Sequence, residues 1–252
     1  MKDRVFQQDA ARFAKNIYDT RKGRIRQAVL QEDLAFLREQ TPHVLDLGAG
    51  LGQINQWFAE KGSMVTHVDA SAEMVELAQQ RHIAAGVAAQ YHYHIAALQE
   101  FSSGSQHYDV VFCHAVLEWL ENPFQAIQIA LRHVKPNGWL SLMFYNYQAK
   151  VMANMVYGNH DYVAAGLKVK KKVRFSPERP LAIEQVIGWL AQSPVTVYRH
   201  SGIRCFNDYL KEPERVNEAE LIALELKYRN QEPYRSLGRY QHLLVRKEGI
   251  HE

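Results

Sequence analysis

A glycine-rich segment between a β-type run and a helix-type run constrains the fold of this chain most. The apolar run from Val44 to Leu47 leads directly into three glycines that alternate with other residues. These glycines are Gly48, Gly50 and Gly52. Glycine accepts positive φ and lets a ligand approach the backbone closely, so glycines at a strand-to-helix turn favour a ligand site.

A second β-type run ends in an acidic residue and strengthens this interpretation. Residues 64–69 are rich in β-formers, and Asp69 closes the run seventeen residues after Gly52. A carboxylate at the end of the second strand accepts hydrogen bonds from a ribose diol. The pattern therefore predicts a nucleotide-type cofactor, although a dinucleotide fingerprint would need glycine at position 53, where Gln53 stands.

Helical and β-type patterns alternate through the middle of the chain. Further strands are predicted at 91–95, 108–113 and 139–144, and helices at 54–60, 72–82 and 123–133. Pro136, Asn137 and Gly138 form a turn signal before the fifth strand. Alternation of this kind predicts an α/β fold, and strands near 195 and 240 would complete a seven-stranded, mostly parallel sheet with helices on both faces.

The chain is expected to form one domain with four parts. Residues 1–40 form an N-terminal helical cap, and residues 41–145 form the cofactor-binding core. Residues 146–180 form a basic insertion or mobile loop after strand five, and residues 181–252 complete the sheet. The acidic core carries a net charge of −5, whereas the first and last parts, 1–40 and 146–252, carry +3 and +5. Such asymmetry favours a polyanionic partner for the flanks.

Composition excludes several classes of protein. The chain is 47% hydrophobic and 23% charged, which does not fit collagen-like, coiled-coil or disordered sequences. Cys113 and Cys205 are too few for a disulfide framework, and the N-terminus is too charged for a signal peptide. No apolar run approaches the length of a membrane span, so a cytoplasmic protein with no membrane association is expected. No histidine and cysteine spacing predicts a metal site.

The glycine loop reads D-x-G-x-G-x-G from Asp46, and in this it resembles the class I S-adenosylmethionine (SAM)-dependent methyltransferases over residues 43–145. Asp46 suits a cationic ligand better than a diphosphate. The resemblance implies a Rossmann-like fold and a set of cofactor-binding residues, which are Asp46, Gly48, Ala49, Gly50, Gly52, Asp69, Ala97, Leu98 and His114. It implies that Ala97 and Leu98 lie near the adenine and that His114 lies beside the transferred methyl group. Ala49 fits this loop if its φ is negative.

The flanking motifs are more specific. They include His114–Trp119 (HAVLEW), Ser141–Asn146 (SLMFYN), Gly202–Leu210 (GIRCFNDYL) and Leu237–Tyr240 (LGRY). Together they resemble the CmoM family of bacterial tRNA 5-carboxymethoxyuridine methyltransferases nearly end to end. The resemblance implies methyl transfer from SAM to the carboxylate of 5-carboxymethoxyuridine at the tRNA wobble position, giving a methyl ester. It also implies that Arg26 pairs with the carboxylate of the cofactor.

Esterification of a carboxylate needs positioning groups more than a base, because the carboxylate is already ionised at pH 7. The positioning candidates are His114, Arg204 and Tyr209. The residues expected to contact substrate or tRNA are Arg4, Lys168, Lys170, Lys171, Lys172, Arg174 and Arg239. Tyr157, Tyr162 and Phe175 flank the lysine-rich run and are candidates to stack an extruded base.

Three other functions remain open from the sequence. A small-molecule O-methyltransferase shares the cofactor loop but would carry an apolar lid in place of the lysine-rich segment. A carboxy-SAM synthase of the same pathway would need a second anionic-substrate pocket and no tRNA surface. A SAM-binding or RNA-binding scaffold without turnover is the third. A monomer is slightly favoured over an oligomer, which the sequence leaves open.

Overall fold

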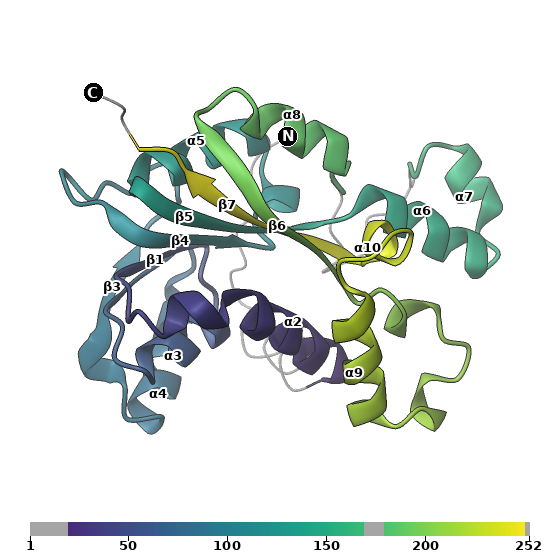
Figure 1. The fold of residues 1–252 in the computed structure, drawn as a ribbon, viewed down its shortest axis with the longest axis horizontal. Coiled ribbons are helices and arrows are strands. Elements are labelled where there is room, and N and C mark those ends of the chain that lie inside the picture. The colour runs from purple at the N-terminus through teal and green to yellow at the C-terminus, as the bar shows by residue number, and fades with distance from the viewer. Residues whose placement is uncertain (1–19, 169–178, 250–252) are drawn as a thin grey trace.

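The computed structural model describes residues 20–168 and 179–249, and it is built around one seven-stranded sheet (Figure 1). The strand order is β3-β2-β1-β4-β5-β7-β6. In chain order the strands are β1 (Val44–Leu47), β2 (Val65–Asp69), β3 (Tyr91–Ile95), β4 (Tyr108–His114), β5 (Val134–Tyr145), β6 (Val195–Ile203) and β7 (Tyr240–Lys247). The seven-stranded sheet predicted from the sequence is therefore confirmed.

Only β7 runs against the other strands of this sheet. Strands β1 to β5 pair in parallel, and β7 is antiparallel to both of its neighbours, β5 and β6. The chain moves outward from β1 to β3 on one side and from β4 onward on the other. The carboxyl ends of β1 and β4 therefore flank the topological switch point, where open α/β sheets bind their ligands.

Helices cover both faces of the sheet (Figure 1). One face carries α2 (Arg21–Arg38), α3 (Gln53–Ala59), α4 (Ala72–Ala84) and α9 (Glu218–Tyr228). The opposite face carries α5 (Pro123–His133) and α8 (Ile183–Leu190). Beyond the sheet, α6 (Tyr147–Val156), α7 (His160–Ala164) and α10 (Tyr234–Leu237) follow or precede strand ends at the carboxyl edge. Short 3-10 turns are η1 (Ala88–Gln90), η2 (Leu117–Trp119), η3 (Asn207–Tyr209) and η4 (Pro213–Arg215).

Polar side chains fix where several of these helices begin. Thr20 accepts a hydrogen bond from the amide of Gly23 at the start of α2, and Ser71 accepts one from Met74 at the start of α4. Asn122 caps α5, whose first residue is Pro123. Such caps satisfy amides that have no partner within the helix. The helix expected at 123–133 is confirmed, and its start could be predicted because Asn122 and Pro123 are adjacent in the sequence.

The helix α2 is part of the core as well as a cover for one end of the molecule. Its residues Val29, Leu30, Leu34 and Leu37 are buried against the sheet face that also packs α3. Full burial of each such side chain contributes about 1.5 to 3 kcal/mol of transfer free energy. The described part of the predicted cap is thus a layer of the domain itself.

Two expectations need correction. The turn signal at 136–138 does not separate α5 from β5: the strand runs from Val134, and the irregular backbone there is a register shift against β4 with φ +61° at Asn137. Residues 147–156 and 160–164, in the part expected to be an insertion or mobile loop, are helical. In the described ranges, no helix is long and apolar enough to cross a bilayer.

Candidate active site

The loop between β1 and α3 has the backbone that its glycines predict. The φ values of Gly48, Gly50 and Gly52 are +72°, +56° and +66°, in the left-handed region that side chains disfavour. Ala49 is absent from the positive-φ residues of the described chain, so the condition for alanine at this position is met. A Cβ at Gly48 would overlap the side chain of Val116. The loop therefore leaves bare backbone at the switch point, where a ligand can approach.

Asp69 at the end of β2 holds this loop in place. Its Oδ2 accepts a hydrogen bond from the Gly50 amide at 2.8 Å, and its Oδ1 accepts one from the Ser71 amide at 2.9 Å. Burial raises the pKa of Asp69, and the two amides oppose that rise. Each carboxylate oxygen still has acceptor capacity for a ribose hydroxyl.

Asp46 lies deeper, beneath the loop. It is 3% exposed, and its Oδ2 accepts a hydrogen bond from Asn55 at 2.8 Å. Asn55 in turn contacts His67 and accepts a hydrogen bond from the Tyr91 hydroxyl. Burial raises the pKa of Asp46 to about 7, against the lowering effect of Asn55. The geometry places Asp46 in a network that ties β1 to α3, β2 and β3.

A chain of hydrogen bonds runs inward from His114, the last residue of β4. His114 Nε2 lies 2.8 Å from Ser141 Oγ, which lies 2.9 Å from His242 Nε2. His242 Nδ1 lies 2.8 Å from Asp33 Oδ2, and Asp33 also accepts a hydrogen bond from Arg229. Burial opposes ionisation of Asp33, but its hydrogen bonds to His242 and Arg229 hold its pKa below the usual range. The chain joins β4, β5, β7 and α2.

A buried carboxyl group that the sequence analysis did not single out follows His114 by four residues, in η2. Glu118, in η2, is 1% exposed, and among the described residues no side chain donates a hydrogen bond to its carboxyl group. Burial raises the pKa of Glu118 to about 8, against backbone amides and the charge of Arg26. Burial also lowers the pKa of His114, with help from the charges of His242 and Arg26. The available sequence signal was an acidic residue in an apolar segment directly after β4.

Ala97 and Leu98 follow β3 at the same edge. Leu98 is buried in the core with Val68 and Phe101, whereas Ala97 is half-buried and accepts the amides of Glu100 and Phe101. The structure thus gathers the described cofactor candidates around the carboxyl ends of β1 to β4. It brings Arg26 to them from α2, since the charge of Arg26 acts on His114 and Glu118.

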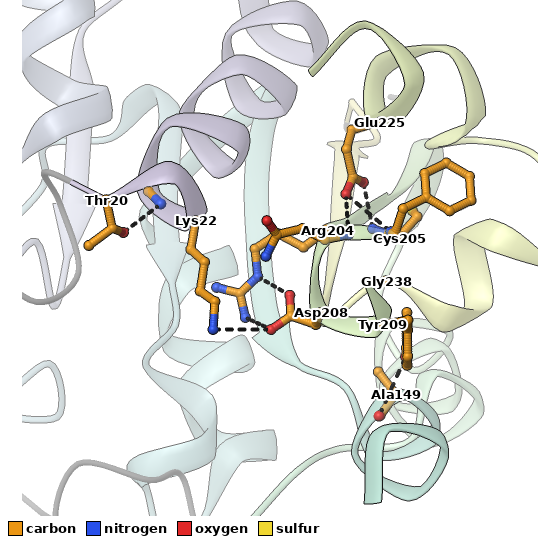
Figure 2. A network of polar contacts seen from close by, with 12 residues as sticks. Thr20, Lys22, Ala149, Arg204, Cys205, Asp208, Tyr209, Glu225 and Gly238 are labelled. Carbon is orange, nitrogen blue, oxygen red and sulfur yellow. Dashed lines mark hydrogen bonds and ion pairs between the residues drawn. The ribbon is translucent and has the colours of Figure 1, made fainter. Parts of the chain in front are cut away.

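A polar network surrounds Arg204 at the end of β6 (Figure 2). Arg204 donates two hydrogen bonds to Asp208, from Nε at 2.7 Å and from a terminal nitrogen at 3.1 Å. Lys22 at the start of α2 lies 3.7 Å from the same carboxylate. The φ of Arg204 is +62°, a strained conformation for a residue with a side chain. Asp208 thus neutralises a guanidinium that the sequence suggested for the substrate.

Glu225 of α9 holds the turn that follows Arg204 through its carboxylate (Figure 2). Its carboxylate accepts three backbone hydrogen bonds, from Cys205 at 2.5 Å, Phe206 at 3.1 Å and Asn207 at 2.9 Å. Burial raises the pKa of Glu225, and these amides oppose the rise. Three amides on one carboxylate fix the backbone directly after Arg204, which offsets the cost of its left-handed conformation.

Arg239 lies next to this network on the entry to β7. Its guanidinium lies 4.9 Å from the centre of the Tyr145 ring, and Tyr145 packs edge-on against Tyr240. No carboxylate or hydrogen-bond acceptor pairs with the Arg239 guanidinium in residues 20–168 and 179–249. The hydroxyl of Tyr209 donates to Leu237 O at 2.8 Å and so anchors the turn that precedes Arg239. Tyr209 therefore positions this turn, while Arg239 keeps an unneutralised charge.

Part of the predicted tRNA surface falls outside the described ranges. The residues concerned are Arg4, Lys170, Lys171, Lys172, Arg174 and Phe175. Of the others, Lys168 is exposed and Tyr157 is 64% exposed, with its hydroxyl donating to Asp208 O.

Among the described residues, no group of three or more His, Cys, Asp or Glu side chains is placed to hold a metal ion.

Comparison with known proteins decides the family. The chain is 41% identical to the tRNA 5-carboxymethoxyuridine methyltransferase of Escherichia coli strain K12, over 98% of this chain and 97% of that protein. This chain belongs to the tRNA 5-carboxymethoxyuridine methyltransferase family. A family model described as a methyltransferase domain also matches residues 45–142. Similarity to the ubiquinone biosynthesis O-methyltransferase of Nitrosospira multiformis is weaker, at 28% over 61% of this chain and 67% of that protein.

Solved structures agree with the fold assignment. The magnesium protoporphyrin IX methyltransferase of Synechocystis PCC 6803, solved with bound SAH, matches with a TM-score of 0.66 at 16% identity, covering 96% of each chain. The plantazolicin methyltransferase BpumL in complex with SAH matches with a TM-score of 0.61 at 15% identity, covering 96% of this chain and 91% of that one. The predicted Rossmann-like class I methyltransferase fold is confirmed, and family membership confirms SAM as the cofactor.

Proposed function

We propose that this protein transfers a methyl group from SAM to the carboxylate of 5-carboxymethoxyuridine at the wobble position of tRNA, forming a methyl ester. The observation that carries the proposal is the pairing of a bare glycine loop with an unneutralised guanidinium at the same sheet edge. The first suits a nucleoside cofactor, and the second suits an anionic substrate. A carboxylic acid attached to a nucleic acid supplies such an anion.

On the cofactor side, this chain's residues bind and orient. The backbone from Gly48 to Gly52 and the carboxylate of Asp69 receive the nucleoside and its amino-acid portion, and Arg26 faces the carboxylate end. These residues fit the cofactor because three of the five loop positions are glycine and because the buried Nδ1 of His114 has no hydrogen-bond partner in the described chain. When bound, SAM supplies an electrophilic methyl group to an in-line oxygen.

On the substrate side, we assign the carboxylate to Arg239 in preference to Arg204. Arg204 already donates two hydrogen bonds to Asp208, so a substrate carboxylate there would compete with a carboxylate of the protein. Arg239 stacks on Tyr145 and has no carboxylate partner within the described ranges. A substrate carboxylate with a normal pKa is ionised at pH 7, so positioning matters more than proton removal.

The tRNA itself is expected to contact the basic flanks. Residues 146–252 carry seventeen basic and twelve acidic side chains, whereas the core carries four and nine. Exposed Lys168 and Tyr157 mark the described part of this surface, beside α6 and α7. Lys170, Lys171, Lys172 and Arg174 extend it in sequence as phosphate-contact candidates, with Arg4 on the other flank. A tRNA substrate also implies a cytoplasmic site of action. All the residues assigned to the site come from one chain, so a monomer suffices for the proposed activity.

The decisive experiment uses labelled SAM and bulk tRNA from cells that lack this enzyme. Digestion to nucleosides should give label in a base-labile methyl ester on 5-carboxymethoxyuridine, and none when the tRNA lacks the carboxymethoxy group. The Asp69→Ala variant serves as a control without cofactor binding. Label that appears only in small molecules, or only in a carboxylated cofactor, would refute the proposal in favour of the two related activities.

A further inference from the structure

A cluster of buried polar and aromatic side chains lies beneath the cofactor loop (residues 48–52) and has no part in the chemistry described above. Its centre is Asn55, in the first turn of α3, which is fully buried. Asn55 contacts one residue from each of three adjacent strands, namely Asp46 of β1, His67 of β2 and Tyr91 of β3. A Cβ at Gly52 would lie 2.5 Å from Asn55 Oδ1, so the cluster reaches the loop itself.

The hydrogen bonds of Asn55 determine which nitrogen of His67 carries a proton. Tyr91 donates its hydroxyl proton to Asn55 Oδ1 at 2.9 Å, which turns Nδ2 of the same side chain toward β1 and β2. There Nδ2 lies 2.8 Å from Asp46 Oδ2 and 3.2 Å from His67 Nδ1. An amide nitrogen donates and cannot accept, so His67 Nδ1 is the acceptor. Burial lowers the pKa of His67 to about 3, so the ring is neutral at pH 7 and carries its proton on Nε2.

His82 of α4 repeats this arrangement next to His67. The two ring centres lie 5.8 Å apart, and His82 Nδ1 lies 2.8 Å from the Tyr93 hydroxyl. The His82 ring also stacks on Tyr91, with ring centres 3.9 Å apart. Burial lowers the pKa of His82 to about 4, so this ring is neutral as well. The Tyr93 hydroxyl has no other acceptor in the described parts of the chain, so it donates to Nδ1, and the His82 proton lies on Nε2.

Both Nε2–H groups are close to the backbone of the cofactor loop. The two Nε2 atoms are buried, and neither has a hydrogen-bond partner within residues 20–168 and 179–249. The backbone of Gly50 acts on the His67 ring and that of Gly52 on the His82 ring, and each opposes the lowering of the pKa. Backbone that favours the protonated form of an imidazole presents a carbonyl oxygen to it. A small inward movement of the loop would therefore complete both hydrogen bonds.

We propose that His67 and His82 are positioning residues for the cofactor loop, and that Asn55 holds His67 in the tautomer this requires. Their Nε2–H groups draw the carbonyls of Gly50 and Gly52 inward, so the opposite side of the backbone faces the ligand. Glycine permits many backbone conformations, and the histidines select one of them. Both histidines are fully buried and do not contact the ligand, so the inference rests on the proposed function only in that the loop binds the cofactor.

The test compares variants for binding of S-adenosylhomocysteine by calorimetry, at a temperature where circular dichroism shows each protein to be folded. His67→Leu removes the N–H group and should weaken binding about 10-fold, the effect of one lost hydrogen bond. His67→Gln keeps an N–H donor on a side chain of similar reach, and should recover binding to within about threefold of wild type. His92→Leu, at an exposed position of β3, is the matched control and should bind as wild type.

Nitrogen-15 spectra of the histidine side chains test the proton positions in the wild-type protein. The spectra should show unprotonated Nδ1 and protonated Nε2 for both His67 and His82. Addition of S-adenosylhomocysteine should move the two Nε2–H proton signals downfield and slow their exchange with solvent, because the hydrogen bonds to the loop shorten. The exposed His92 should show neither change.

Three results would overturn the inference. Wild-type affinity of folded His67→Leu for S-adenosylhomocysteine would show that His67 acts on stability alone. Equal losses in His67→Leu and His67→Gln would show that the loop does not require the N–H group. A proton on Nδ1 of His67 would show that this ring offers the loop no donor, and that result needs no variant. None of these assays contains tRNA or measures methyl transfer, so failure of the proposed function and failure of loop positioning are distinguishable.

Discussion

The two ends of the active site are built in opposite ways. The cofactor end uses bare backbone at Gly48 to Gly52, and its acidic groups Asp46 and Asp69 are hydrogen-bonded within the protein. The substrate end uses long charged side chains, and a strained turn there is held by Glu225. The cofactor end therefore depends on an unobstructed backbone, whereas the substrate end depends on where charges are placed. Substitutions should separate the two.

The largest expected effect is on the stability of the folded protein, at the buried carboxylate of Asp33. Asp33→Asn removes the charge that pairs with Arg229 and one of the oxygens that can contact His242 Nδ1, and it should lower the free energy of unfolding by about 3 kcal/mol at pH 7. The pKa of Asp33 is lowered in the folded state, so its contribution is present above its ordinary value and disappears as pH falls through the lowered value. Urea titrations from pH 7 to pH 2 should show the difference from wild type shrinking.

Asp161→Asn is the matched control because the Asp161 side chain is 98% exposed. It should change stability by less than about 0.5 kcal/mol. A constant difference between Asp33→Asn and wild type at all pH values would contradict the ionised state of Asp33.

At the cofactor end, Gly48→Ala should be the most damaging small change. The added methyl group overlaps Val116 and must adopt φ near +72°, which together cost about 2 to 4 kcal/mol. Binding of S-adenosylhomocysteine should weaken in proportion. The double variant Gly48→Ala with Val116→Ala removes the overlap but keeps the backbone strain, so it should recover part of the loss. Full recovery would show that backbone conformation is unimportant at Gly48.

At the substrate end, Arg239→Ala should lower kcat/KM for tRNA by about 10- to 100-fold, the value of a lost charge-assisted hydrogen bond. Binding of S-adenosylhomocysteine should change less than twofold. Arg246→Ala, on the same strand but stacked on Trp139, is the control and should retain activity. If Arg239→Ala instead loses cofactor affinity, the division between the two ends is wrong.

Glu225→Gln tests whether the strained turn is a positioning device. Loss of the carboxylate charge weakens three backbone hydrogen bonds, so kcat/KM for tRNA should fall about 5- to 10-fold with unchanged cofactor affinity. Glu220→Gln, on the exposed part of α9, is the control. A fall in stability alone, with unchanged kcat/KM at a temperature where both proteins are folded, would refute positioning.

The smallest effect is expected for the basic run. Replacing Lys170, Lys171 and Lys172 with alanine should reduce the slope of log affinity against log salt by about 2, since each single-strand phosphate contact adds about 0.7. Filter binding of tRNA over a range of salt concentrations measures this slope. Unchanged tRNA affinity and slope would exclude the run from the tRNA surface.

The comparison also explains what the sequence predicted well. Gly48 and Asp69 lie within one β–α–β unit, so their spacing alone indicates where they meet. By contrast, the turn at Arg204 depends on Glu225, and Lys22 pairs with Asp208; both interactions join residues that lie far apart in the chain. Periodicity carries no information about such pairs. Glu118 was missed for a related reason, because its burial depends on how η2 packs against β5.

The antiparallel strand has a consequence for how this molecule is assembled during synthesis. Strand β7 follows β6 in the chain but lies between β5 and β6 in the sheet. Until β7 has been made, β6 has no neighbour to pair with and the outer edge of β5 is open, as for any unpaired strand. The residue expected to read the substrate, Arg239, enters with that same strand. A nascent chain that already holds the cofactor loop therefore cannot yet recognise its substrate.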